Sequence, residues 1–100
     1  MISSLFSPRE VGAQLGARLM ALRLDRDWRR STLAERAGVS VPTIARFETR
    51  GQITLENLLK LAQALGVLGD FDSVFARPPA RSIADLEREE AGATRRRGRR

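Results

Sequence analysis

The sequence contains no cysteine and no histidine. Without cysteine the chain forms neither a disulfide nor a thiolate metal site, and without histidine it has no imidazole ligand or base. The two absences together exclude Ser-His-Asp triads and Cys-His nucleophiles. The sequence also has no phosphate-cradling glycine loop. We therefore expect a protein that is not an enzyme and that carries no cofactor or metal ion.

Long apolar runs are absent as well. No uninterrupted stretch approaches the roughly 20 residues that a membrane-spanning helix needs. The segment from Met1 to Phe6 is too short and too uncharged for a secretory signal. We expect a cytoplasmic protein without a membrane partner.

The positive charge is large and unevenly placed. The 100 residues carry a net charge of +6, which favours an anionic partner such as nucleic acid or a membrane surface. Residues 1–76 hold ten basic and eight acidic side chains, whereas residues 77–100 hold eight and four. Five of the last six residues are arginine, namely Arg95, Arg96, Arg97, Arg99 and Arg100.

The paired prolines Pro78-Pro79 mark a boundary, because they cannot continue a helix and favour an extended linker. We expect one domain over residues 7–76. Residues 77–100 are expected to form a linker, a short helix and a disordered, arginine-rich tail that can still contact phosphate.

Apolar residues recur at helical spacings, and no stretch alternates with period two for long enough to form a sheet. Ser7, Pro8 and Glu10 predict a helix start with a capping box, and this helix should run to about Asp25. Its apolar stripe comprises Val11, Leu15, Leu19 and Leu22.

Shorter helices are expected after the first. The second has no strong cap and should stop at Gly38, the third should begin after Ser40 and end near Gly51, and the fourth should begin after Thr54 and end at Gly66. The expected inward residues are Leu33, Ala34 and Ala37, then Ile44 and Phe47, then Leu55, Leu58, Leu59, Ala62 and Leu65. A short fifth helix is predicted over residues 68–75, and residues 82–85 can cap one more. The predicted fold class is all-α.

The segment from Arg30 to Glu48 is the most informative. Ala34 is small where two helices cross, Gly38 lies at the turn, and Val39 can pack into the angle between them. Together these positions predict two helices joined by a tight turn at a steep angle. This geometry lets the second helix enter a DNA major groove while the first lies across the backbone.

Residues 28–66 resemble the DNA-binding domain of the Xre family, the helix-turn-helix regulators related to Cro and lambda repressor. With the leading helix, the resemblance covers roughly residues 8–75. The matching residues are Leu33-Ala34, Gly38-Val39-Ser40, Thr43-Ile44, Phe47-Glu48, Leu55, Leu58-Leu59 and Ala62. The resemblance implies a five-helix, lambda-repressor-like domain that binds double-stranded DNA.

The chain departs from the family pattern at two positions. Arg30 stands where the family usually has a glutamine that reaches a phosphate, and Asp27 replaces the usual glycine before Trp28. The first helix must therefore end differently.

Three features are shared with the HipB-like antitoxins. They are Ser7-Pro8, Arg46-Phe47-Glu48 and Gln52-Ile53-Thr54-Leu55. This resemblance implies autorepression and binding to a HipA-like kinase toxin.

The outward side of the third helix should face DNA. Arg46 is the strong candidate for a bidentate pair with guanine, with a phosphate contact or a solvated side chain as the alternatives. Val41 and Pro42 offer only apolar contact, for example to a thymine methyl group, and with so few base-reading groups DNA shape can contribute. The predicted DNA-binding residues are Ser40, Val41, Pro42, Thr43 and Arg46, with Arg29, Arg30 and Arg50 as phosphate contacts.

Other conspicuous residues have structural interpretations. We expect Trp28 to pack on the core rather than to stack on a base, and Glu48 to form a structural ion pair or cap. The carboxylates Asp85, Glu87, Glu89 and Glu90 are expected to form a solvated face rather than a metal site.

The sequence thus predicts a sequence-specific regulator that represses its own operon as a homodimer on a two-fold operator. Leu68, Phe71, Val74 and Phe75 either form the dimer surface or close the core of the monomer. One alternative function is an antitoxin whose main task is to neutralise a toxin. Another is a nonspecific nucleic-acid or RNA binder that acts through the arginine tail, against which the helix-turn-helix spacing argues.

Overall fold

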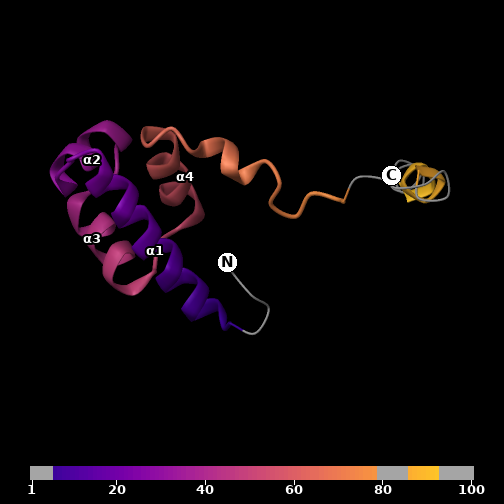
Figure 1. The fold of residues 1–100 in the computed structure, drawn as a ribbon, viewed down its shortest axis with the longest axis horizontal. Helices are drawn as coiled ribbons and strands as arrows, with labels where there is room; N and C mark the ends of the chain where they lie inside the picture. Colours follow the sequence, from indigo (N-terminus) through magenta and orange to yellow (C-terminus); the bar gives the residue numbers. More distant parts are fainter. Residues whose placement is uncertain (1–5, 79–85, 93–100) are drawn as a thin grey trace.

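Every regular element in the part of the chain that the computed structural model describes, residues 6–78 and 86–92, is helical (Figure 1). The elements are α1 (Pro8–Asp25), α2 (Arg30–Ala37), α3 (Val41–Arg50), α4 (Leu55–Ala64) and the 3-10 helix η1 (Leu68–Phe71). Residues 86–92 are also helical, whereas residues 82–85, which were expected to cap a further helix, lie outside the described ones. The all-α prediction is confirmed.

Short-range signals set the helix starts as predicted. The Ser7 hydroxyl accepts a hydrogen bond from the Glu10 N–H at 3.1 Å, and the Glu10 carboxylate accepts one from the Ser7 N–H at 3.3 Å. The Ser40 and Thr54 hydroxyls accept from the N–H groups three residues later, at 3.3 and 3.2 Å. These bonds satisfy N–H groups that have no partner within the helix. No side chain caps α2.

The prediction that α1 must end differently for lack of a glycine was wrong, because Asp27 forms the left-handed cap that glycine usually forms. Asp27 adopts the left-handed conformation, with φ of 55°, at the position where the family usually has glycine. The N–H groups of Asp27 and Trp28 donate to the carbonyls of Leu24 and Arg23, at 2.9 and 3.2 Å. Because a side chain disfavours this backbone conformation, Asp27 costs stability that glycine would not.

The core lies where α1, α2, α3 and α4 meet. Its buried side chains are Leu19, Leu33, Val39, Ile44, Phe47, Leu61 and Leu65. Trp28 is half-buried and packs against this core, as expected.

The prediction for α4 was partly wrong. Leu55 is 67% exposed, whereas Leu61, which was not predicted to face inward, is fully buried. The face of α4 that packs on the core is formed by Leu58, Leu61 and Leu65. Leu55 is the first residue of the helix and lies at the edge of that face.

The predicted fifth helix was wrong in its extent. It is a 3-10 helix over Leu68–Phe71, followed by turns up to Phe75, whose φ of 58° cannot continue a helix. Leu68, Val74 and Phe75 are exposed, and Phe75 completely so. These three side chains therefore do not close the core of the monomer.

Helices α1 and α3 touch at their backbones, and they lie side by side in Figure 1. A Cβ atom at Gly12 would come within 2.7 Å of the Gly51 carbonyl oxygen, and one at Gly16 would overlap the Phe47 carbonyl. Gly51 itself ends α3 with φ of 70°. The glycines of α1 therefore bring its first turns against the C-terminal end of α3.

Candidate nucleic-acid interface

The turn between α2 and α3 has the predicted geometry. Gly38 is left-handed, with φ of 70°, and its N–H donates to the Ala34 carbonyl at 2.9 Å. The Val39 N–H donates to the same carbonyl at 3.2 Å, while the Val39 side chain is buried in the core. Two backbone hydrogen bonds to Ala34 and the buried Val39 side chain thus fix the turn, and they set the direction of α3 relative to α2.

Helix α3 is buried on one face and exposed on the other. Ile44, Phe47 and Glu48 are buried. The exposed residues are Val41, Pro42, Arg46, Thr49 and Arg50, with Thr43 and Ala45 half-buried. The structure therefore places Val41, Pro42 and Arg46 on the outward side, where the sequence predicted them.

Two hydroxyls at the start of α3 are engaged with each other. The Ser40 and Thr43 oxygens lie 2.7 Å apart, and the Ser40 hydroxyl also accepts the Thr43 N–H. Thr43, predicted to contact DNA, is thus also part of the local cap at the start of α3. Each hydroxyl keeps further hydrogen-bonding capacity at the helix start.

Beside α3 lies an open groove of about 470 Å³, which we call the α3 groove. It is lined by Pro42, Thr43, Arg46, Gln52, Ile53, Thr54 and Asn57. Among these residues the only charged side chain is that of Arg46, and the amides of Gln52 and Asn57 add neutral hydrogen-bond donors. An anionic ligand meets no opposing carboxylate in this lining.

Sequence reasoning missed Gln52 and Asn57. Gln52 was noted only as part of a family motif, and Asn57 follows the Thr54 cap by three residues. The available signal was the Thr54 cap, because the start of a helix presents N–H donors and polar side chains that favour an anion.

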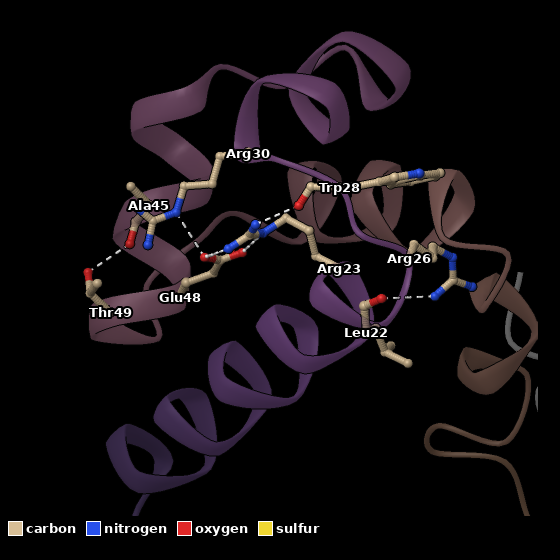
Figure 2. Close-up of polar contacts among 8 residues, drawn as sticks. All are labelled: Leu22, Arg23, Arg26, Trp28, Arg30, Ala45, Glu48 and Thr49. Atoms are coloured by element: carbon tan, nitrogen blue, oxygen red, sulfur yellow. Dashed lines mark hydrogen bonds and ion pairs between the residues drawn. The ribbon is translucent and has the colours of Figure 1, made fainter.

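A buried ion-pair network behind α3 joins three helices (Figure 2). The Glu48 carboxylate accepts from Arg23 Nε at 2.7 Å and Nη2 at 2.9 Å, and from Arg30 Nε at 2.9 Å. Arg23 Nη1 also donates to the Trp28 carbonyl at 2.8 Å. The predicted structural ion pair of Glu48 is confirmed, and it ties α1 and α2 to α3.

The charges of this network stabilise one another. Burial by itself raises the pKa of Glu48, but the hydrogen bonds and positive charges of Arg23 and Arg30 outweigh it and lower that pKa below its usual value. The hydrogen bond from Arg23 to Glu48 likewise raises the pKa of Arg23 against the opposing effect of desolvation. Glu48 and Arg23 are therefore charged at neutral pH, and each stabilises the charged form of the other.

Arg30 occupies the open side of this network. Its side chain is 36% exposed, whereas those of Arg23 and Glu48 are 7% and 0% exposed. Glu48 holds the Nε atom of Arg30, so the predicted phosphate contact would be made by the remaining guanidinium nitrogens.

The other predicted phosphate contacts lie apart from the network. Arg29 is exposed at the N-terminal cap of α2, and Arg50 is exposed in the last turn of α3. Neither guanidinium has an ion pair within residues 6–78 and 86–92. Both are therefore available to an external anion.

The carboxylates and arginines that the sequence singled out after residue 76 lie away from α3 or outside the described residues. Glu87 and Glu90 are exposed and Glu89 is half-buried on the helix of residues 86–92, whereas Asp85 and the five tail arginines lie outside the described residues. No group of three potential metal ligands occurs in the described part of the chain. Among the helices of those same residues, none is long and apolar enough to cross a membrane.

The chain matches a protein-family model. The model of the helix-turn-helix family matches residues 19–70, which is more than half of the chain and runs from the middle of α1 into η1. None of the curated protein sequences matches the chain. The matched segment contains the α2–turn–α3 unit, the buried ion-pair network and the α3 groove. The chain therefore belongs to the Xre family of helix-turn-helix proteins, and it is a DNA-binding transcription regulator.

Proposed function

We propose that this regulator reads a specific operator through the outward face of α3 and represses its own operon as a dimer. The observation that carries this proposal is the position of Arg46. It is exposed on α3 and lines a groove in which it is the only charged group, while the opposite face of the same helix is fixed in the core.

In this proposal α3 lies in the major groove. Arg46 donates two hydrogen bonds to a guanine, which is worth about 1–3 kcal/mol of discrimination against other bases. Val41 and Pro42, at the start of α3, offer apolar contact to thymine methyl groups.

Phosphate contacts would flank these base contacts. Arg29 and Arg30 at the start of α2 would contact the phosphates on one side of the DNA major groove. Glu48 fixes the direction of the Arg30 side chain. Gln52 in the loop before α4 and Asn57 in the first turn of α4, with the Ser40 and Thr43 hydroxyls, would contact the phosphates on the other side. Such contacts set the register of a protein on DNA without reading its sequence.

We assign DNA binding to residues 7–76 and propose that they act in pairs. Two copies would place their α3 helices about 34–36 Å apart on successive major grooves. The exposed side chains of Leu68, Val74 and Phe75 support a dimer surface, because the monomer leaves them uncovered. Occupancy of the operator by this dimer would block polymerase.

A second candidate function is that of an antitoxin. It is supported by the resemblance of residues 7–8, 46–48 and 52–55 to HipB-like proteins and by the exposed apolar side chains after η1, which a protein partner could cover. The full chain would then co-purify with the product of a neighbouring kinase-like gene. Failure of such a pair to associate at micromolar concentrations would contradict this role.

The proposed regulation is tested with the full chain and a duplex from the region upstream of its own gene. At physiological salt we expect this duplex to bind at least about 10³-fold more tightly than a scrambled duplex. A reporter driven by the upstream region should be repressed by the chain and released by Arg46→Ala. Equal binding to the two duplexes would contradict sequence-specific regulation.

A further inference from the structure

We propose that Arg9, with Arg50 and Gln52, forms a further phosphate-binding site that extends the DNA-binding surface from α3 onto the first turn of α1. This inference rests on the proposed function. It adds a contact from the segment of the chain that precedes residue 19, where the match to the helix-turn-helix family begins.

The packing of α1 on α3 creates the site. The capping box fixes the start of α1 at Pro8, and the close approach of Gly12 to Gly51 sets the first turn of α1 against the end of α3. A side chain at either glycine would push the two backbones apart. Between them lies an open hollow of about 490 Å³.

The lining of this hollow favours an anion. It consists of Arg9, Ala13, Arg50 and Gln52, so two guanidiniums and one amide face it without an acidic side chain. Neither arginine has an ion pair among the described residues. The neighbouring carboxylate of Glu10 is bound to the Ser7 N–H in the capping box.

Two positive charges on one concave surface repel each other until an anion lies between them. A phosphate offers several acceptor oxygens to both guanidiniums, and Arg–phosphate hydrogen bonds are charge-assisted. The Gln52 side chain can add a neutral donor.

The hollow is continuous with the proposed recognition surface. Gln52 lines both this hollow and the α3 groove. Arg46 and Arg50 are four residues apart on α3, about one helical turn, and therefore lie on the same face. A DNA strand whose bases face Arg46 would thus carry a phosphate past Arg50 and Arg9.

The test is a salt titration of the full chain on the upstream duplex, comparing Arg9→Ala with Arg18→Ala. Both positions are exposed arginines of α1, but Arg18 lies nine residues, about two and a half turns, further on and lines the hollow beside α4 and η1 instead. We expect Arg9→Ala to lower the slope of log K against log salt by about one and to weaken binding roughly eightfold at about 0.1 M salt. Arg18→Ala should change neither quantity, and Arg9→Lys should keep the slope because it keeps the charge.

The outcomes separate this site from the proposed function. If Arg46→Ala weakens binding but Arg9→Ala leaves slope and affinity at the wild-type values, only the Arg9 site is refuted. If Arg18→Ala lowers the slope as much as Arg9→Ala, the effect is one of overall charge, and the site is likewise refuted. If the wild-type chain does not prefer the upstream duplex to a scrambled one and Arg46→Ala has no effect, the proposed function fails and this inference fails with it.

Discussion

The strongest prediction for stability concerns Glu48. Its carboxylate is fully buried and accepts three hydrogen bonds of 2.7–2.9 Å from Arg23 and Arg30. Glu48→Gln preserves the shape of the side chain but removes its charge and turns an N–H₂ donor toward guanidinium donors. Arg23, whose side chain is only 7% exposed, is then left as an uncompensated buried charge.

The magnitude follows from this burial. Breaking a buried ion pair by removing one partner costs about 3–5 kcal/mol, and small domains have a free energy of unfolding of about 5–15 kcal/mol. We expect Glu48→Gln to lower the free energy of unfolding by about 3–5 kcal/mol. Urea denaturation, monitored by circular dichroism and by the fluorescence of Trp28, the single tryptophan, measures this change.

Glu56→Gln provides a matched control. It is the same chemical change in an exposed i,i+4 pair, where Glu56 and Lys60 are 81% and 44% exposed and their charged atoms are 3.9 Å apart. We expect a loss of at most about 0.5 kcal/mol. If Glu48→Gln and Glu56→Gln have equal effects, the network does not stabilise the fold and the reasoning is refuted.

The same network predicts a pH dependence. Because the pKa of Glu48 is lower in the folded than in the unfolded chain, its contribution is fully present above the unfolded value, near pH 4.5, and is lost as the pH falls through the folded value. The difference in stability between the wild type and Glu48→Gln should therefore be largest at neutral pH and shrink below about pH 4.5. A difference that grows on acidification would contradict the assigned direction of the shift.

Three further predictions concern the backbone and the apolar surface. Asp27→Gly should raise the free energy of unfolding by about 0.5–1 kcal/mol, because glycine adopts the left-handed conformation without the strain of a side chain. Ala21→Gly, at an exposed right-handed position of α1, should lower it by about 1 kcal/mol. A lower free energy of unfolding for Asp27→Gly in urea denaturation would contradict this. Gly16→Ala should cost about 1–3 kcal/mol in the same assay because its Cβ overlaps the Phe47 carbonyl, and a neutral effect would contradict the close approach of α1 and α3. Phe75→Ser should weaken self-association in sedimentation equilibrium and leave the urea stability of the monomer, measured at a concentration where the chain does not dimerise, unchanged. Leu24→Ser, also at an exposed apolar position, should not weaken self-association, and dimers unaffected by Phe75→Ser would contradict the proposed dimer surface.

The starts of α1, α3 and α4 and the ends of α2 and α3 could be predicted because their signals are local. Ser7, Ser40 and Thr54 cap the N–H groups three residues ahead, and Gly38 and Gly51 adopt left-handed conformations directly after their helices. The outward position of Arg46 likewise follows from the period of a single helix.

The remaining features depend on how the helices meet. Which face of α4 is buried, and hence the exposure of Leu55, is decided by neighbours far away in the sequence. The α1–α3 contact through Gly16 and the position of Arg9 beside Arg50 have no local signal for the same reason. The sequence marked Arg30 as a phosphate contact, but its bond to Glu48 required the packing of α2 on α3.

The most direct test of DNA recognition by α3 is the effect of Arg46→Ala on specificity, measured as the ratio of affinities for the upstream and the scrambled duplex at one salt concentration. We expect this ratio to fall about 5- to 150-fold, the equivalent of about 1–3 kcal/mol, and Arg18→Ala to leave it unchanged. Arg46→Ala that weakens both duplexes equally and keeps the ratio would show that Arg46 contacts only phosphate, and would contradict base reading by α3.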